Sequence, residues 1–334
     1  MTIPEDTRRR HAQLADEIRR HDRLYYQDAA PEIPDQEYDR LYRELSDIES
    51  RFPALATPDS PTQRVGGAPL KEFASARHAV PMMSLDNTYS EAELREFFRR
   101  ISERLPGEAV TYIVEPKVDG VAISLRYERG RLAKAATRGD GTTGDDVTAN
   151  ARTIRSLPLG LGTSAEILEF RGEVYMSRAE FDRINAAREA DGLPLFANPR
   201  NSTAGSLKLL DPREVARRKL SIALYGHGEI RGAEIRSHSD LLALFRDMAL
   251  PGPRQTWRCR SADEVIAAIA ELDRARRSFP FDTDGAVVKV DSFDQRERLG
   301  ATAKAPRWAI AYKYSAERAE TILRAITLQV GRTG

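Results

Sequence analysis

The sequence contains one cysteine, Cys259, and no long apolar run. A single cysteine excludes an internal disulfide framework and a zinc site built from cysteines within this chain. The first 20 residues have no apolar core of the signal-peptide kind, and no run approaches the roughly eighteen apolar residues that a membrane span needs. We therefore expect a cytoplasmic protein that has no membrane partner.

The sequence also lacks an excess of charge of either sign. Its 52 basic and 51 acidic side chains leave a net charge of +1. Bulk charge therefore does not attract a polyanion, and any surface for nucleic acid must be a local patch. The 334 residues, of which 41% are hydrophobic, leave room for two domains. We expect a monomer.

Two common phosphate-binding motifs are missing as well. Residues 138 to 146 (RGDGTTGDD) form a glycine-rich turn before a predicted helix, but they have neither the spacing of a P-loop nor that of a dinucleotide-binding loop. Two interpretations stay open. The segment is a mobile loop that brings Arg138 to a substrate, or it is a plain hairpin connection.

The first 66 residues have the pattern of a helical domain. Apolar residues recur at helical spacing from residue 6 to about residue 28, and again from Asp35 onward. Pro34 followed by Asp35 is typical of a helix start. Residues 56 to 69 are rich in proline, glycine and polar residues, which predicts a linker.

On the second helix, Asp35, Tyr38 and Asp39 stand at i, i+3 and i+4 and therefore share a face. One interpretation is a solvated carboxylate pair beside a core tyrosine. The other is a site for a ligand that needs aromatic stacking and hydroxyl acceptors together, such as a cationic nicotinamide riboside. Tyr25 and Tyr26, at the end of the first helix, would add ring faces.

Beyond the linker, short strands alternate with helices that begin with a capping box. In each box a serine precedes a glutamate by three residues, and the pairs are Ser90 with Glu93, Ser177 with Glu180, and Ser261 with Glu264. These pairs predict where helices start and carry no functional weight.

Three predicted strands, at residues 168 to 176, 285 to 290 and 308 to 314, carry polar side chains of interest. Alternation places Glu169, Arg171 and Glu173 on one face of the first, Val287 and Lys289 on one face of the second, and Lys313 beside Ala309 and Ala311 on one face of the third. Small alanines would leave space for a base or a phosphate. The alternative is that the lysines lie solvated on edge strands.

The stretch from residue 113 to 120, IVEPKVDG, carries the strongest candidate for a reactive residue. The apolar run before it predicts a short strand that Pro116 ends. The alternation from Val121 onward predicts a further strand with one buried face. Lys117 would then lie at the mouth of a sheet, unless the segment is a simple surface turn.

Phosphoryl chemistry gives these residue types a common purpose. A lysine amine must lose its proton before it attacks phosphorus, and neighbouring cations favour that loss. Lys289, Lys313 and Arg138 would supply those cations and stabilise the phosphate oxygens. Glu115 and Glu173 would hold ribose hydroxyls, a base amine or a magnesium ion.

The sequence resembles the N-terminal half of bacterial NAD-dependent DNA ligases along nearly its whole length. The segments that carry the resemblance are PEIPDQEYD (31 to 39), TPDSPTQRVG (57 to 66), SLDN (84 to 87), KVDG (117 to 120), TRGDGTTG (137 to 144), RGEV (171 to 174), FANPRN (196 to 201), FDTDG (281 to 285), APRWA (305 to 309) and VGRTG (330 to 334). The lysine motif alone is shared with ATP-dependent ligases and capping enzymes. The segments 31 to 39 and 57 to 66 are specific to the NAD-dependent family.

This resemblance implies an α+β fold: a nucleotidyltransferase domain of the ligase type, unrelated to ATP-grasp, with antiparallel sheets flanked by helices and a small helical domain before it. Residues 1 to 66 would bind nicotinamide mononucleotide, and residues 67 to 317 would form the adenylation domain. Residues 318 to 334 would begin the connection to an OB-fold. Family members continue into that fold and further domains, so we expect an adenylation fragment.

The resemblance also implies roles for single residues. Lys117 would attack the α-phosphate of NAD and carry the adenylate, with magnesium assisting. The other implied contacts are Ser84, Leu85, Glu115, Arg138, Glu173, Lys289 and Lys313 for the nucleotide, Tyr25, Asp35, Tyr38 and Asp39 for the nicotinamide mononucleotide end, and Arg200 and Lys208 for DNA. This sequence departs from the family at Tyr26, where some members have histidine, at Ser202 and Thr203, which replace an alanine pair, and at Lys208, where arginine is frequent.

The implied function is the self-adenylation step of a DNA ligase that seals nicked duplex DNA in replication and repair. We expect only weak DNA binding from this part. Two alternatives stay open: a nucleotidyltransferase that uses ATP or GTP, and a scaffold that binds nucleic acid without catalysis.

Overall fold

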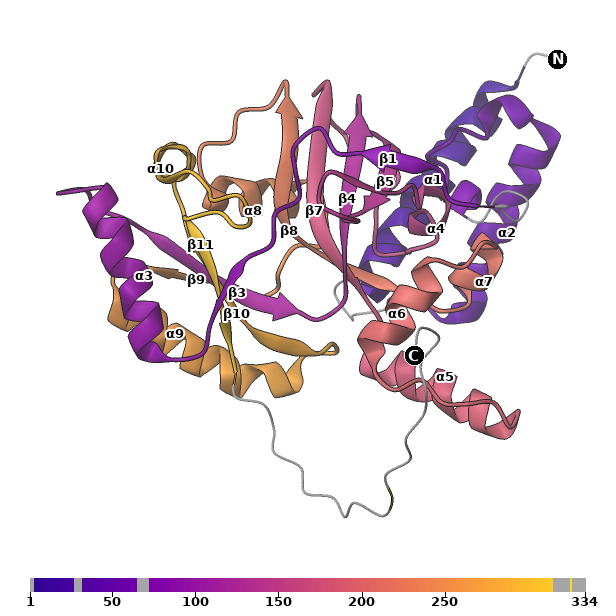
Figure 1. The fold of residues 1–334 in the computed structure, drawn as a ribbon. Helices are drawn as coiled ribbons and strands as arrows, with labels where there is room; N and C mark the ends of the chain where they lie inside the picture. The colour runs from indigo at the N-terminus through magenta and orange to yellow at the C-terminus, as the bar shows by residue number, and fades with distance from the viewer. Residues whose placement is uncertain (1–2, 27–31, 65–71, 315–324, 326–334) are drawn as a thin grey trace.

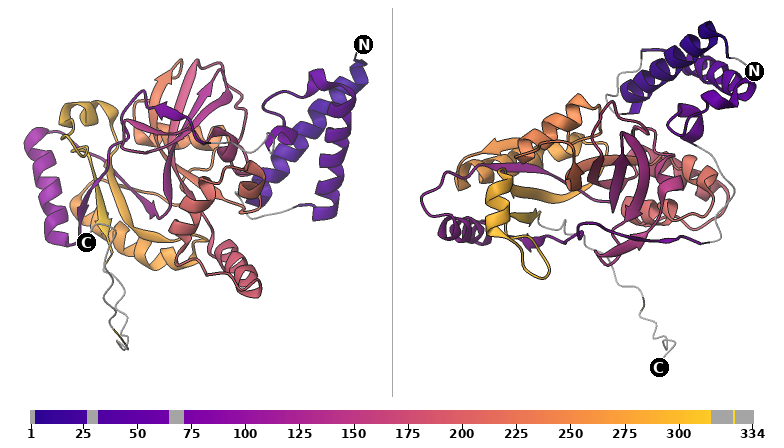
Figure 2. Two further views of the ribbon diagram at one scale, coloured as in Figure 1. Left: turned by 45° about the vertical axis from the view of Figure 1, so that its right-hand side comes forward. Right: turned by 90° about the horizontal axis from the view of Figure 1, so that it is seen from above.

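The computed structural model describes residues 3–26, 32–64, 72–314 and 325 (Figure 1). Two helices, α1 (Glu5–Tyr26) and α2 (Asp35–Arg51), lie at one end of the molecule in every view (Figure 2). They pack through Leu14 and Ile18 of α1 against Leu41 and Leu45 of α2. These are the faces that the apolar spacing predicts, because residues three and four apart meet on one side of a helix.

Within the predicted linker, residues 61 to 64 form ordered structure. Two short 3₁₀ helices, η1 (Pro53–Leu55) and η2 (Pro61–Arg64), follow α2. Arg64 is buried and donates hydrogen bonds to the carbonyl oxygens of Ile154 (3.0 Å) and Leu157 (2.9 Å). Residues 61 to 64 therefore tie the helical pair to the rest of the chain. Residues 65 to 69 of the predicted linker lie outside the described part.

Two sheets form the centre of the molecule. The five-stranded sheet has the order β2-β11-β10-β3-β9, and the four-stranded sheet has the order β5-β4-β7-β8. The bounds are β2 (Asp86–Thr88), β3 (Tyr112–Val118), β4 (Val121–Glu128), β5 (Arg131–Thr137), β7 (Ile167–Tyr175), β8 (Ser221–Arg231), β9 (Trp257–Cys259), β10 (Thr283–Val290) and β11 (Ala309–Lys313). Among the described strand pairs, β2 with β11 is parallel and the others are antiparallel. The predicted α+β fold with antiparallel sheets is confirmed.

Helices cover both sheets. One face of the five-stranded sheet packs on α3 (Glu91–Arg104) and α9 (Ala262–Ala275), whose Leu94 and Val265 join Val288 in one core. The core of the four-stranded sheet includes Phe170 of β7 and Phe245 of α8 (His238–Asp247). The remaining helices are α4 (Thr148–Ala151), α5 (Arg178–Ala190), α6 (Pro199–Leu207), α7 (Pro212–Ala216), η3 (Arg276–Ser278) and α10 (Phe293–Leu299). None of the described helices combines the length and the apolar character needed to cross a bilayer.

The three predicted N-cap serines are confirmed. Ser90, Ser177 and Ser261 each accept a hydrogen bond of 3.2 Å from the backbone N–H of the glutamate three residues on. The hydroxyl replaces an acceptor that the first turn of a helix lacks.

Pro116 does not end a strand. β3 continues to Val118, and Pro116 pairs with Ala286 of β10. On the other side of β3, β9 pairs only with Tyr112 to Val114 in the described chain. The missing N–H of Pro116 therefore interrupts no described ladder on that side, which is where proline is tolerated in a sheet.

The glycine-rich segment is a compact turn. β5 is followed by a turn at 139 to 142 and by β6 (Thr143–Asp145), which pairs with β1 (Ser75–Arg77), and α4 follows as predicted. Asp140 accepts hydrogen bonds from the N–H groups of Thr142 and Thr143, both at 2.8 Å. Gly139 and Gly141 have φ values of 57° and 93°, the left-handed region that favours glycine. The segment thus has the geometry of a hairpin connection, and Arg138 at its start also lines the cavity described below.

Candidate functional site

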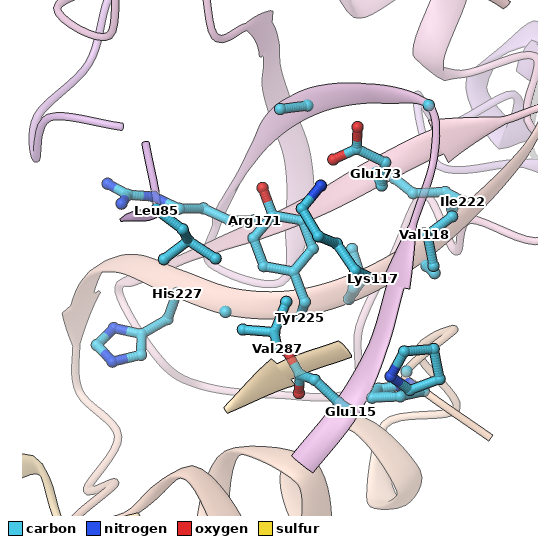
Figure 3. Close-up of a pocket in the computed structure, with 18 of the residues that line it drawn as sticks. Leu85, Glu115, Lys117, Val118, Arg171, Glu173, Ile222, Tyr225, His227 and Val287 are labelled. Carbon is cyan, nitrogen blue, oxygen red and sulfur yellow. The ribbon is translucent and has the colours of Figure 1, made fainter. Parts of the chain in front are cut away.

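A cavity of about 1570 Å³ lies between the two sheets, lined by residues of β3, β7, β8, β10 and β11. Strand alternation decides which side chains face it. In β10, Ala286, Val288 and Val290 belong to the core with α3 and α9, so Val287 and Lys289 turn toward the cavity. Lys117, Glu173 and Tyr225 line the same space (Figure 3).

Lys117 lies within β3, opposite Gly285 of β10, and its amine faces a carboxylate. Its Nζ is 3.1 Å from Oδ1 of Asp284, and Lys313 donates to the other oxygen of the same group. Burial raises the pKa of Asp284, but the hydrogen bond from Lys313 and the charge of Lys117 outweigh burial and lower it. Lys313, one of the expected cations, thus shares a carboxylate with Lys117, and the sequence did not predict that this ionised aspartate orients the amine.

Two glycines beside Lys117 are required by close backbone contacts. A Cβ on Gly120 would lie 2.1 Å from the carbonyl oxygen of Val174, and one on Gly285 would lie 2.0 Å from that of Tyr312. Both distances are far below a van der Waals contact, so only glycine fits. The first contact brings the turn after Lys117 directly against β7, next to Glu173.

The inner end of the cavity contains a buried ionic cluster. Glu115 receives a hydrogen bond from Lys289 at one oxygen and lies 2.9 Å from Nε2 of His238 at the other. Burial raises the pKa of Glu115, but Lys289 and His238 outweigh burial and lower it to about 2. Lys289 is 6% exposed, so the interpretation as a solvated edge-strand lysine is wrong. The reason is that β10 lies between β11 and β3.

Glu173 has the opposite environment. Burial raises its pKa to about 7, and the nearby positive charges of Lys117 and Arg200 only partly offset burial. It therefore exchanges its proton near neutral pH. The described residues hold no cluster of three or more His, Cys, Asp or Glu side chains suited to a metal. Magnesium does not need such a cluster, because one carboxylate and phosphate oxygens of a substrate with several waters suffice.

The segment before β2 forms one wall of the cavity. Ser84 and Leu85 line it, and Nη1 of Arg138 lies 3.4 Å from the Ser84 hydroxyl. Nη2 of Arg171, on β7, donates a 2.7 Å hydrogen bond to the carbonyl oxygen of Val80 and so holds this segment beside the strand. Lys313 lines the cavity. Ala309 and Ala311 pair with Lys289 and Val287 and so share the cavity face of the sheet, but both are buried and do not line the cavity themselves.

Arg200 and Lys208, the predicted DNA contacts, lie at the rim. Each pairs with a carboxylate, Arg200 with Asp119 and Lys208 with Asp145, both at 2.7 Å. More than half of each basic side chain is exposed. The departures Ser202 and Thr203 are fully buried in α6, and the Thr203 hydroxyl donates to the carbonyl oxygen of Pro199 at 2.8 Å.

The helical pair does not bring its predicted residues to the cavity. The Tyr38 hydroxyl donates to Asp22 (2.7 Å) and accepts a hydrogen bond from Arg155 (3.1 Å), whose guanidinium lies 5.8 Å from the centre of the tyrosine ring. Asp39 is exposed on α2. Of the described helical pair, Arg23 lines the cavity, whereas Tyr38 and Asp39 do not. The side chains of Tyr25, Tyr26 and Asp35 lie outside the described part.

Sequence reasoning missed Asp284, Tyr225, His238 and Arg296. Asp284 stands in the quoted segment FDTDG, which was a usable signal. Tyr225 offers its ring and its carbonyl oxygen, which accepts a 2.6 Å hydrogen bond from Lys289. Arg296 is buried between the rings of Trp308 and Phe293, 4.2 and 4.7 Å from their centres. No local pattern marks these three residues.

Comparison with known proteins agrees with this geometry. Residues 70–317 match the family model of the NAD-dependent DNA ligase adenylation domain. Residues 4–66 match that of the DNA ligase-like, N-terminal NAD+-binding domain.

Proteins named DNA ligase are similar to the chain over nearly its whole length. The relative from Methylacidiphilum infernorum is 51% identical over 99% of this chain and 48% of its own length. The relative from Akkermansia muciniphila is 51% identical over 96% of this chain and 41% of its own length, and that from Brevibacillus brevis is 50% identical over 96% and 48%. The chain thus spans about half the length of the curated relatives it matches.

Proposed function

The chain belongs to the family of NAD-dependent DNA ligases, and on this basis we propose that Lys117 is the nucleophile that takes AMP from NAD. The Lys117 nitrogen attacks the α-phosphorus, a P–N bond forms, and the bond to the oxygen of nicotinamide mononucleotide breaks. The amine proton passes to solvent or to a nearby base. The observation that carries this proposal is the Lys117 amine held by Asp284 in the cavity that Lys313, Arg138 and Glu173 also line.

Different residues of the cavity would bind the adenine, the ribose and the phosphate of the nucleotide. Glu115, Lys289 and Leu85, at the buried end, would hold the adenine. Glu173 would bind ribose hydroxyls, and Arg138 and Lys313 would stabilise the oxygens of the reacting phosphate. Ser84, through its contact with Arg138, would keep that guanidinium in place.

Magnesium would be held by Glu173 together with phosphate oxygens, where it would neutralise part of the phosphate charge. Loss of the Glu173 proton, near neutral pH, would provide the ionised carboxylate that the metal needs.

Residues 1 to 66 would bind the nicotinamide mononucleotide end through Tyr25, Asp35, Tyr38 and Asp39, and residues 67 to 317 would form the adenylation domain. Tyr38 and Asp39 do not line the described cavity, so a nucleotide bound there reaches them only if the helical pair shifts. Such a shift would open the contact between Tyr38 and Arg155.

In the whole enzyme, the adenylate would pass to the 5′-phosphate of a DNA nick, and the 3′-hydroxyl would then displace AMP. Arg200 and Lys208, exposed at the rim of the cavity, would contact the phosphates of that DNA.

The test is self-labelling of the purified chain with NAD that carries a label in its adenylate, in the presence of magnesium. The wild-type chain should gain covalent label. Lys117→Ala and Lys117→Arg should both fail, because a guanidinium stays protonated and cannot attack. Lys134, exposed on β5, provides the matched control, and Lys134→Ala should label at the wild-type rate.

Label that survives either substitution at Lys117 would remove it as the nucleophile. Label from ATP but not from NAD would favour an ATP-using nucleotidyltransferase. A folded wild-type chain that takes label from neither would favour a scaffold without catalysis.

A further inference from the structure

We propose that His238 is a positioning residue for purine recognition, which holds the Glu115 carboxylate so that it accepts a hydrogen bond from the 6-amino group of adenine. This inference rests on the proposed function, in which Glu115 meets the base.

The placement of His238 separates it from the nucleotide. His238 is the first residue of α8 and is fully buried, and it does not belong to the lining of the described cavity. Glu115 does line the cavity, although only 1% of it is exposed. His238 therefore lies behind the carboxylate and acts on a bound base only through it.

The protonation states determine the direction of the hydrogen bond. Glu115 is ionised, because its pKa is lowered to about 2, and an ionised carboxylate can only accept. Burial and the charge of Lys289 lower the pKa of His238 to about 4, so the ring is neutral at pH 7 and carries one N–H. That hydrogen must be on Nε2, which lies 2.9 Å from Glu115 Oε2.

The second ring nitrogen of His238 makes no hydrogen bond with the described residues, which is unfavourable for a buried polar atom. Nδ1 of His238 is buried and has no hydrogen-bond partner among the described residues. An unpaired buried acceptor is unfavourable, and an apolar side chain of similar shape would avoid it. Packing alone therefore does not explain a histidine at this position, whereas a donor aimed at Glu115 does.

With Lys289 and His238 bound, the Glu115 carboxylate can still accept a hydrogen bond from a base. Lys289 occupies Oε1 and His238 occupies Oε2, and each carboxylate oxygen has a second lone pair. Lys289 is itself held by the carbonyl oxygen of Tyr225. With both oxygens tied, the carboxylate plane has one orientation, and the remaining lone pairs have a defined direction.

The backbone holds His238 relative to the same strand that carries Lys289. The N–H of His238 donates to the carbonyl oxygen of Asp291 at 2.8 Å. The Asp291 carboxylate accepts from the N–H and the hydroxyl of Ser239 at 2.8 and 2.9 Å. Asp291 follows the end of β10, so one strand positions both groups that contact Glu115.

The experiment compares NAD with an analogue whose purine has hydrogen in place of the 6-amino group. Self-adenylation by the wild-type chain should favour NAD by about ten- to a hundredfold in kcat/KM, the range of one hydrogen bond to a charged group. His238→Leu should reduce this preference to less than about threefold, mainly by raising the KM for NAD. His238→Gln places an amide N–H near the position of Nε2 and should restore most of the preference. His238→Asn is as polar but too short and should not restore it.

The chain offers a matched control in a second histidine-glutamate contact. Nε2 of His11 lies 2.8 Å from Oε1 of Glu49 in the helical pair, away from the lining of the cavity. His11→Leu should leave the preference for the 6-amino group unchanged.

Each outcome separates two hypotheses. If the wild-type chain does not label from NAD, the proposed function fails. If it labels and prefers NAD, but a folded His238→Leu or His238→Asn variant keeps the full preference, only the role of His238 is refuted. A wild-type chain that labels equally from NAD and the analogue also refutes it. Should His238→Leu not fold, the preference for the 6-amino group is compared between His238→Gln and His238→Asn. Equal preferences in these two variants would refute the role of His238.

Discussion

Glu173 lines the proposed site, and its ionised form lowers the stability of the folded chain. Its pKa is raised to about 7 in the folded chain from an ordinary value of 4.5, so the fold binds this proton more tightly than the unfolded chain does. Glu173 therefore does not change the free energy of unfolding below pH 4.5. It lowers that free energy increasingly as pH rises, and the loss is complete above pH 7. Glu173→Gln should stabilise the chain relative to wild type at pH 8 by about 1 to 3 kcal/mol, and not at pH 4.5. Thermal unfolding at the two pH values measures this difference.

The same variant should label from NAD more slowly, because the amide cannot accept as a carboxylate does. Glu189→Gln, at an exposed position of α5, is the control and should change neither quantity. An equal stability difference at both pH values would show that Glu173 does not titrate in this range.

At the scale of elements, η2 joins the helical pair to the sheets through Arg64. Its guanidinium donates to carbonyl oxygens on the chain after α4, and its Nε lies 3.6 Å from a carboxylate oxygen of Asp22 on α1. Burial lowers the pKa of Arg64 and raises that of Asp22, although each charge partly offsets this for the other. Arg64→Ala should lower the free energy of unfolding by about 2 to 4 kcal/mol, because buried carbonyls and a carboxylate lose their donor. Urea unfolding gives this value.

Arg43→Ala is the matched control, since Arg43 is exposed on α2, and it should shift stability by less than about 0.5 kcal/mol. Adding Asp22→Asn to Arg64→Ala should cost less than the sum of the two single changes, because the unpaired carboxylate is removed. Additive costs would argue against coupling between Arg64 and Asp22.

At the scale of the whole molecule, charge controls the proposed contact with DNA. The net charge is +1, and Arg200 and Lys208 already pair with Asp119 and Asp145. A phosphate must compete with these carboxylates, so binding of nicked duplex DNA should be weak. With two phosphate contacts, the slope of log Kobs against log salt should be about −2, and Arg200→Ala or Lys208→Ala should each reduce it by about 1. Fluorescence anisotropy across a salt series measures the slope.

A slope much steeper than −2 would show that further cations of this chain contact the backbone. An unchanged slope in both variants would remove Arg200 and Lys208 from the DNA surface.

The sequence alone determined the local features of this protein. Capping at Ser90, Ser177 and Ser261, the apolar faces of α1 and α2 and the alternation in β10 all depend on neighbours within a few residues. Backbone geometry converts such spacing directly into structure. Motifs around Lys117 and Glu173 likewise indicated the chemistry, because only a few residue types can perform it.

Only the tertiary structure decided which groups meet. The contact of Lys117 with Asp284 spans 167 residues, and that of Glu115 with His238 spans 123. Both depend on the order of strands in the sheet and on how α8 is held beside β10, which no local pattern encodes. The place of Pro116 inside a strand and the burial of Arg64 were decided in the same way. Each depends on a partner element that is remote in sequence, because packing brings together surfaces whose spacing in the chain is arbitrary.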